Sequence, residues 1–343
     1  MKLKAGFRCL VALCAAALLP PTMAAKPPAP ETAVTTEQAP LAFAYVVISV
    51  ADMDRALGLW VERFGMQVVT RRDGSDPDLA RAWGLPADGI VEQVLLRTPG
   101  MTDGGVHLVR FKTPGPTVRE GAAPTDLVMK SVDISVREIA ARHAELTAAG
   151  YKFRSAPSRL KAENLEFMEV HMFGPDDVNL VFVDIPSRPE PVSDKQYGVA
   201  PQIVVITPDN VRETAFFQST LGLAMISHNT FVGPEIEKAV GLPKGASLDV
   251  RILGNPDNHY GRLEFVQYGG ATSRNLYPRA KPPARGMLSI SYLVKDLAPI
   301  LARAKALGVI DHGNVSTVLG EGRLVSLTTP AGMRVDIMQL RRS

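Results

Sequence analysis

The sequence has very little cysteine, and both thiols, Cys9 and Cys14, lie within its first 24 residues. The chain beyond them therefore forms no disulfide, no thiolate metal site and no cysteine nucleophile, which suits an oxidising compartment. The sequence also lacks a glycine-rich phosphate loop, a Gly-x-Ser-x-Gly elbow and a His-Glu-x-x-His motif. These absences exclude the nucleotide-binding, serine-hydrolase and zinc-protease classes that such motifs mark.

No apolar run is long enough to span a bilayer. Basic residues precede the apolar run 9–19, and Thr22-Met23-Ala24 follows it as a small-residue cleavage site. Residues 1–24 therefore predict a secretory signal peptide, with a membrane anchor as the less favoured alternative. The Pro/Ala/Thr-rich residues 25–40 predict a disordered linker. We expect an exported protein, periplasmic or secreted, whose mature chain begins near Ala25.

The chain also lacks a real excess of one charge. It has 38 Lys and Arg against 35 Asp and Glu, and Lys2, Lys4 and Arg8 of the signal account for the surplus of +3. Nothing in this balance favours nucleic acid. We expect a small-molecule substrate or ligand as the partner, no nucleic acid and no membrane span, and a monomer or homodimer.

An ungapped internal repeat is the most informative feature that is present. Residues 45–110 recur at 202–267, and the matching positions include Asp52 with Asp209, Gly65 with Gly222, and Gly84-Leu85-Pro86 with Gly241-Leu242-Pro243. A period this long indicates a duplicated domain, because solenoid repeats are much shorter. The predicted division is a first domain at 41–186, a linker at 187–199 and a second domain at 200–343.

Each copy predicts the same order of elements. A β-branched run precedes an aspartate that suits a helix N-cap, Asp52 or Asp209, and the helix ends at Gly65 or Gly222. Two more strands follow, and a shorter unit of the same kind completes each half. Its predicted elements are strand 127–132, helix 136–149 and strands 166–172 and 179–183, or strand 288–294, helix 297–307 and strands 323–328 and 334–338. The fold class is therefore α+β, with four βαβββ-like units, two in each domain.

This order and its motifs resemble the vicinal oxygen chelate superfamily, which includes glyoxalases, extradiol dioxygenases, epimerases and bleomycin-resistance proteins. The resemblance covers about 41–340. It depends on the segments from Val50-Ala51-Asp52 to Phe64-Gly65-Met66, from Phe216-Phe217 to Leu221-Gly222-Leu223, on both Gly-Leu-Pro triplets, and on the turns Gly174-Pro175-Asp176-Asp177 and Thr329-Pro330-Ala331-Gly332. It implies that paired units close into two tandem cups, each able to hold a divalent metal that polarises a substrate oxygen.

Carried over by position, the resemblance implies a metal site in the second domain. Its ligands would be Gln202, Glu264, Ser289 and Asp336, with Glu264 and Asp336 converging as the catalytic carboxylates. Such an oxygen-rich set favours Mn²⁺ or Mg²⁺, although the sequence does not distinguish Mn, Mg, Zn, Ni and Fe. Ser289 stands where the family usually has an imidazole, which weakens the site. Each carboxylate has the alternative of an ordinary ion pair.

The first domain offers a weaker set. His107 occupies the family position, together with Tyr45, approximately Asp126, and Val181, so we expect no metal there. We assign His107, Tyr268 and Arg334 to substrate contacts. A lone histidine is more often a hydrogen-bonded structural residue, and this alternative remains open for His107.

Two functions remain. The first is an exported, glyoxalase-like metalloenzyme of lyase, isomerase or dioxygenase type, acting on a small oxygenated or aromatic molecule in the second cup. The second is a metal-free protein of bleomycin-resistance type that sequesters a small molecule. The missing imidazoles favour binding alone, whereas the carboxylates of the second domain favour an enzyme.

Overall fold

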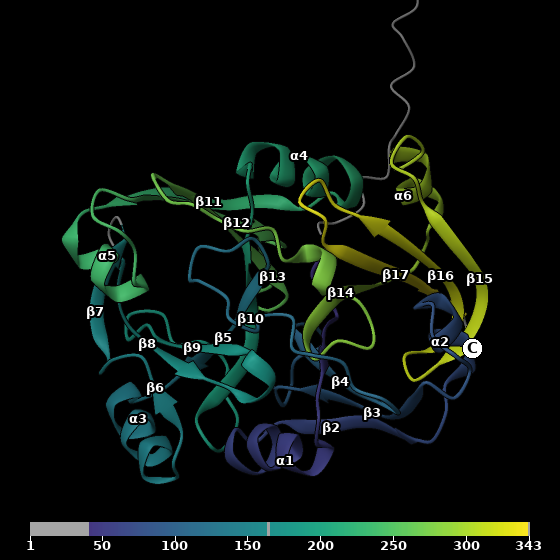
Figure 1. Ribbon diagram of the computed structural model, residues 1–343, viewed down its shortest axis with the longest axis horizontal. Helices are drawn as coiled ribbons and strands as arrows, with labels where there is room; N and C mark the ends of the chain where they lie inside the picture. The colour runs from purple at the N-terminus through teal and green to yellow at the C-terminus, as the bar shows by residue number, and fades with distance from the viewer. Residues whose placement is uncertain (1–40, 163–164, 342–343) are drawn as a thin grey trace, which may run out of the picture. The chain divides into compact units, whose positions relative to one another are not determined.

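Four consecutive βαβββ-like units make up the chain in this computed structural model, which describes residues 41–162 and 165–341 (Figure 1). The predicted signal peptide 1–24 and linker 25–40 lie outside the described residues. Within the described part, no helix is both long enough and apolar enough to cross a membrane.

The first two units come from the first half of the chain. The first unit contains β1 (Tyr45–Ser49), α1 (Met53–Leu57), the π-helical turn η1 (Gly58–Arg63), β2 (Gln67–Asp73), α2 (Pro77–Ala82), β3 (Ile90–Arg97) and β4 (Gly105–Phe111). The second contains β5 (Met129–Val136), α3 (Ile139–Ala148), β6 (Lys152–Phe153), β7 (Ser158–Ala162), β8 (Leu165–Phe173), the 3-10 turn η2 (Pro175–Asp177) and β9 (Asn179–Asp184).

The second half repeats this order. The third unit contains β10 (Tyr197–Ile206), α4 (Asn210–Leu221), β11 (Ala224–Val232), α5 (Pro234–Val240), β12 (Ser247–Gly254) and β13 (Arg262–Gly269), and the 3-10 turn η3 (Tyr277–Arg279) follows it. The fourth contains β14 (Gly286–Val294), α6 (Ala298–Arg303), β15 (Ile310–Thr317), β16 (Gly320–Thr328) and β17 (Arg334–Leu340).

The duplicated aspartates start equivalent helices. The carboxylate of Asp52 accepts a hydrogen bond from the backbone N–H of Arg55, and that of Asp209 accepts one from Arg212, each at 3.0 Å. Both satisfy backbone donors that the first helical turn leaves free. Gly222 ends α4 with a φ of +71°, a conformation that favours glycine. The predicted α+β fold with two tandem cups is confirmed.

The strands pair into two curved sheets that each combine units from both halves. The sheet with the order β15-β16-β17-β14-β1-β4-β3-β2 joins the fourth unit to the first and is called the terminal sheet. The sheet with the order β11-β12-β13-β10-β5-β9-β8-β6, with β7 beside β8, joins the third unit to the second and is called the central sheet. The division at 187–199 thus does not separate one cup from the other.

The first strands of the units explain this exchange of partners. The first strand of each unit has one edge that pairs antiparallel with the first strand of another unit. The hydrophobic pattern of the sequence does not predict which other unit supplies that strand. β10 starts soon after β9 ends and pairs with β5 of the second unit, while β1 pairs antiparallel with β14. The second and third units, which the short connection between β9 and β10 joins, therefore pair with each other. The first and fourth units are left to pair with each other.

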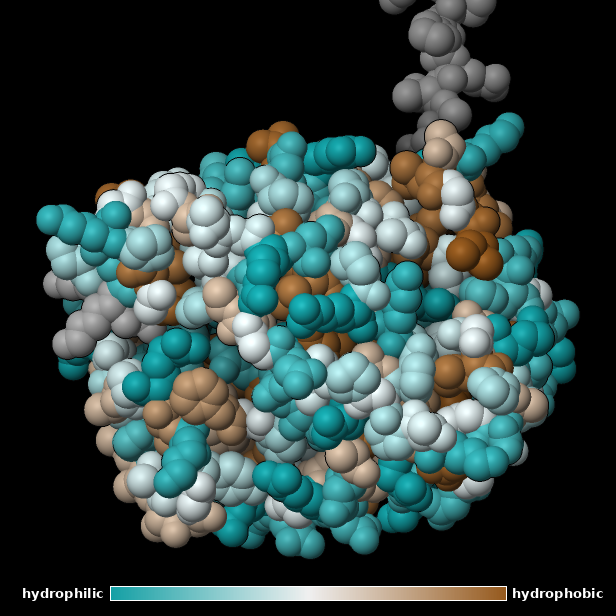
Figure 2. Space-filling model, viewed as in Figure 1, coloured by the Kyte–Doolittle hydropathy of each residue, from teal (hydrophilic) through white to brown (hydrophobic). Residues whose placement is uncertain are grey.

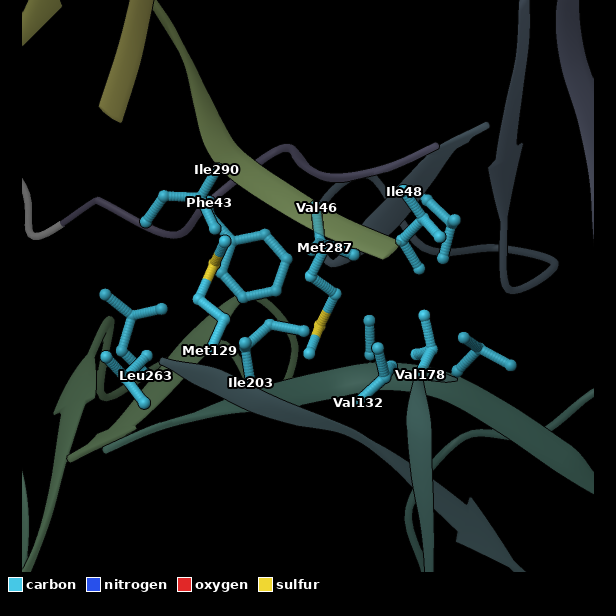
Figure 3. Packing of buried hydrophobic residues seen from close by; sticks show 14 of the residues in the cluster. Phe43, Val46, Ile48, Met129, Val132, Val178, Ile203, Leu263, Met287 and Ile290 are labelled. Carbon is cyan, nitrogen blue, oxygen red and sulfur yellow. The ribbon is translucent and has the colours of Figure 1, made fainter. Parts of the chain in front are cut away.

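One face of each sheet packs into a shared apolar core. Figure 3 shows Val46, Ile48 and Met287 of the terminal sheet lying opposite Met129 and Ile203 of the central sheet. Residues of α1, α3, α4 and α6 belong to the same core. Because side chains alternate along a strand, the neighbouring residues point to the opposite face of each sheet.

Each opposite face has its own apolar cluster beneath a short helix. Residues of α2 join one cluster on the terminal sheet, and Val240 of α5 joins another on the central sheet. We call these faces the terminal cup and the central cup. On the outer surface, hydrophilic and weakly polar residues cover most of the face in Figure 2, with smaller apolar areas among them.

Candidate active site in the central cup

The predicted site residues are divided between the two cups. Gln202 on β10, Glu264 on β13 and Tyr268 on β13 belong to the central sheet. The terminal sheet holds the other four, which are His107 on β4, Ser289 on β14, and Arg334 and Asp336 on β17. The expected convergence of Glu264 with Asp336 therefore does not occur, because the third and fourth units pair with different partners.

The central cup instead brings Glu264 to a carboxylate that the sequence analysis missed. The side-chain amide of Gln202 donates to Glu264 Oε2 at 2.5 Å and to Asp133 Oδ2 at 2.7 Å. Asp133 on β5 is buried, with only 4 % of its surface exposed. The sequence could have identified it, because Asp133 stands in the apolar run Val132-Asp133-Ile134 and a carboxylate buried there needs a partner.

Burial changes the acidity of both carboxyl groups. Burial raises the pKa of Glu264 to about 7, with a smaller contribution from the nearby charge of Glu169. The pKa of Asp133 is also raised, first by burial and then by repulsion from Glu264 and Glu169. Two close carboxyl groups resist losing both protons, so the pair retains a proton at a pH where exposed carboxyl groups have lost theirs.

A buried lysine lies in the same cup at a β-bulge. Val204 pairs with Ser131 and Val205 with Met129, so Lys130 has no partner on β10. A bulge of this kind redirects a side chain. Lys130 Nζ donates to the hydroxyl of Tyr268 at 2.8 Å, and burial lowers the pKa of Lys130 to about 7.

The terminal cup holds a polar network around His107. His107 Nε2 lies 2.9 Å from Gln93 Oε1, and Gln93 donates to Asp76 Oδ2 at 3.0 Å. Asp76 in turn caps α2 by accepting from Leu79 N–H at 3.1 Å. Burial lowers the pKa of His107 to about 3, so its imidazole is neutral at neutral pH. This geometry supports the structural alternative for His107.

Asp336 is engaged within the same cup. Its carboxylate accepts from Ser326 Oγ at 2.5 Å, from Arg334 Nε at 2.9 Å and from Trp83 Nε1 at 3.3 Å. Arg334 also donates to the carbonyl oxygen of Ala82, which ties β17 to α2. Ser289 is buried on β14. Asp336 and Arg334 thus anchor α2 and Trp83 over the terminal sheet.

The divalent metal implied by the family resemblance does not fit the donors of the central cup. Gln202 directs its NH₂ group to both carboxylates, and an NH₂ group donates hydrogen bonds and does not ligate a cation. Among residues 41–162 and 165–341, no three His, Cys, Asp or Glu side chains come close enough together to hold a metal ion. Gln202, Glu264 and Asp133 are therefore arranged as a hydrogen-bonded cluster.

Comparison with known proteins agrees with this architecture. Residues 42–182 match the family model described as the Glyoxalase/Bleomycin resistance protein/Dioxygenase superfamily. The crystal structure of glyoxalase I from Zea mays is similar with a TM-score of 0.59 and 15% sequence identity, over 87% of this chain and 92% of that one. A "putative dioxygenase" from Bacillus subtilis is similar with a TM-score of 0.52 and 10% identity, over 88% of this chain and 86% of that one. No curated protein matches the sequence. At these identities, the solved structures establish the fold alone.

Proposed function

The chain belongs to the vicinal oxygen chelate superfamily, and on that premise we propose that its central cup binds a small oxygenated molecule and moves a proton through Glu264. The observation that carries this proposal is the Glu264–Gln202–Asp133 cluster, in which Asp133 is buried, Glu264 and Gln202 are partly buried, and the pKa of Glu264 is raised to about 7. A base with a pKa near the working pH is effective in proton transfer. Such clusters of shifted groups are more frequent at functional sites than elsewhere.

The reaction class supported best is proton transfer next to a carbonyl group, as in an isomerase or lyase. The ionised Glu264 takes a proton from a substrate carbon, and the C–H electron pair moves toward the adjacent carbonyl to form an enolate. The Tyr268 hydroxyl accepts from Lys130, which leaves its own O–H free to donate to the enolate oxygen. With an α-hydroxy carbonyl compound as substrate, the hydroxyl proton moves to the enolate oxygen while Glu264 returns its proton to the former carbonyl carbon, so that the carbonyl and hydroxyl groups exchange places.

Hydrogen exchange tests this proposal whatever the product of the reaction is. Small aldehydes and ketones with an acidic C–H are incubated with the protein in D₂O, and the loss of each C–H signal is followed by NMR. We expect exchange with the wild type, its loss in Glu264→Gln, and no change in Glu166→Gln on β8, whose side chain is 58% exposed. Equal exchange in both variants would contradict a role for Glu264.

Binding without turnover is the second candidate function. It is favoured by the hydrogen bonds of Gln202, which already occupy one oxygen of each carboxylate. This function predicts saturable binding of a ligand in the central cup with no exchange of its C–H hydrogens. The exchange experiment and a parallel calorimetric titration separate the two candidates.

Metal dependence is tested by elemental analysis of the purified protein. The proposal predicts less than stoichiometric Mn, Fe, Ni and Zn, and exchange activity that survives chelation. A divalent ion near one per chain that is lost in Glu264→Ala would replace the proposal with the metalloenzyme predicted from sequence.

Export is a further part of the proposed function. The basic start, short apolar run and small-residue site of residues 1–24 support a cleaved signal. Protein recovered from the extracytoplasmic fraction is expected to begin near Ala25, as checked by N-terminal sequencing. Recovery there with an intact Met1 would contradict cleavage.

A further inference from the structure

Three cationic side chains gather in the central cup on the Tyr268 side of Glu264. They are Lys130 at the bulge of β5, Arg119 in the connection between β4 and β5, and Arg154, which follows β6. Arg119 and Arg154 are close enough to Lys130 for their charges to depress its pKa further, after the larger effect of burial. The same two guanidinium groups act on the hydroxyl of Tyr268.

Packing holds the two arginines in this region. The guanidinium carbon of Arg154 lies 5.6 Å from the ring centroid of Phe173, and its Nη1 lies beside Gly241 at the end of α5. Arg119 is partly buried, and this burial lowers its pKa. Packing thus positions Arg154, and the charges of Arg119 and Lys130 lie close to it.

The carboxylates near these cations, Glu169 and Glu264 near Lys130 and Asp126 and Asp177 near Arg119, form no salt bridge with them. Nη1 of Arg119 and Nε of Arg154 are buried without a hydrogen-bond partner. Among the salt bridges of residues 41–162 and 165–341, none involves Arg119, Lys130 or Arg154. Like charges gathered out of water repel one another, and donors left without acceptors are costly. An anion placed between them would relieve both costs.

The other cup shows that the fold itself does not require this charge. The terminal sheet has the same bulge, since Val47 pairs with Ser289 and Ile48 with Met287, so that Leu288 takes the place of Lys130. Phe111 takes the place of Tyr268 in the repeat, and both Leu288 and Phe111 are buried in an apolar cluster. The charged set is therefore a property of the central cup alone.

We propose that the central cup recognises an organic anion, whose oxyanion group binds between Arg119, Lys130 and Arg154 while its uncharged part extends along β13 toward Glu264. This inference rests on the proposed function, which makes the central cup the ligand site, and it adds the substrate class. A guanidinium group donates two parallel hydrogen bonds to a carboxylate or phosphate, and an ammonium adds a point charge. The oxyanion is thus a carboxylate or a phosphoryl group on a small molecule.

Binding of simple probes tests the inference. The probes are benzoate and phenyl phosphate as organic anions, inorganic phosphate as an anion without an organic part, and benzyl alcohol as a neutral control. Affinities come from calorimetric titration, and the gain in melting temperature on saturation is measured in parallel. We expect benzoate or phenyl phosphate to bind and stabilise the protein, and benzyl alcohol to do neither. The stronger of the two anions identifies the oxyanion class, and inorganic phosphate alone would indicate an adventitious ion only.

Variants place the binding in the central cup. Arg119→Gln, Arg154→Gln and Lys130→Met should each weaken binding of the anion at least tenfold, and Arg154→Lys should retain part of it. Arg159→Gln on β7 is the matched control, because that side chain is 75% exposed and lies on the same sheet. Circular dichroism checks that each variant is folded. Unchanged affinity in all three folded variants, or equal binding of the neutral probe, would overturn the inference.

The outcome is separable from that of the proposed function. Anion binding that persists in Glu264→Gln, without hydrogen exchange on any probe or ketone in the wild type, supports the anion site and rejects proton transfer. Exchange on ketones that requires Glu264, together with an anion affinity that Arg119→Gln, Arg154→Gln and Lys130→Met leave unchanged, supports proton transfer and rejects the anion site.

Discussion

At the residue scale, burial favours the neutral form of two different side chains that occupy equivalent positions in the two cups. His107 in the first unit corresponds to Glu264 in the third; His107 is buried and Glu264 is partly buried. Burial disfavours whichever form is charged, so it lowers the pKa of His107 to about 3 and raises that of Glu264 to about 7. Of these two side chains, only Glu264 changes its charge near neutral pH, which makes it the better candidate for proton transfer.

The shifted pKa of His107 predicts a loss of stability in acid. In the folded protein the imidazole stays neutral down to about pH 3, whereas the unfolded chain binds a proton below its ordinary pKa of 6.5. The free energy of unfolding therefore falls by about 1.4 kcal/mol per pH unit below that value. Urea unfolding should show wild type losing about 2 kcal/mol relative to His107→Gln between about pH 7 and pH 5. If the free energies of unfolding of wild type and His107→Gln changed in parallel with pH, the burial of a neutral imidazole would be contradicted.

Glu264 predicts the opposite dependence on pH. Its folded-state pKa of about 7 lies above the ordinary 4.5, so its contribution to stability is complete below 4.5 and is lost as pH rises through 7. Glu264→Gln keeps the shape without the charge. We expect the variant to gain on wild type by about 2 kcal/mol between about pH 5 and pH 8 in urea unfolding. Glu166→Gln, on the exposed part of β8, should show no such gain.

At the scale of elements, the sequence pattern predicted buried strands and missed exposed ones. The β-branched runs led to β1 and β10, and the duplicated aspartates to the starts of α1 and α4. β2, β11 and β15 were not predicted. They are largely exposed strands whose side chains face water, so they have no strong apolar alternation to reveal them. Lys130 was missed because a bulge redirects its side chain, and bulges leave no clear mark in sequence.

The matched bulges support a prediction at this scale. Leu288→Lys places an ammonium in the apolar cluster of the terminal cup, where Phe111 offers no hydroxyl as an acceptor. We expect a loss of about 3 kcal/mol or more in the free energy of unfolding. Lys130→Met in the central cup removes a buried charge and should cost far less. Similar costs for the two variants would mean that the two cups do not differ in polarity as described.

At the scale of the whole molecule, the repeat predicted four units and two cups, but the predicted pairing of consecutive units within each half was wrong, because each sheet joins units of both halves. The first strands of all four units present similar edges, and a one-dimensional pattern does not distinguish their partners. For the same reason, Glu264 and Asp336 were expected in one site, and Asp133 of the other half was not expected there. The central cup depends on both halves of the chain, since Asp133 and Gln202 come from different ones.

This exchange of partners predicts how the halves behave when they are separated. Residues 41–190 and 191–343, expressed alone, each lack the partner units of both sheets. Neither half should show cooperative thermal unfolding as a monomer, whereas the two co-expressed should copurify and unfold cooperatively. Calorimetry and light scattering check this outcome. A half that unfolds cooperatively as a monomer would contradict the strand pairing described above.

The raised pKa of Glu264 is what enables the proposed proton transfer, and a carbon-13 NMR titration of the glutamate side-chain carboxyl groups measures it. Among the glutamates that the structure describes, two should titrate near pH 7 in the wild type: Glu264, and Glu213, which is buried beneath the 329–333 turn and whose pKa is also raised to about 7. We expect Glu264→Gln to remove one of these two signals and to leave the other. A wild type in which every glutamate except Glu213 titrates below about pH 5, the ordinary range, would contradict this expectation.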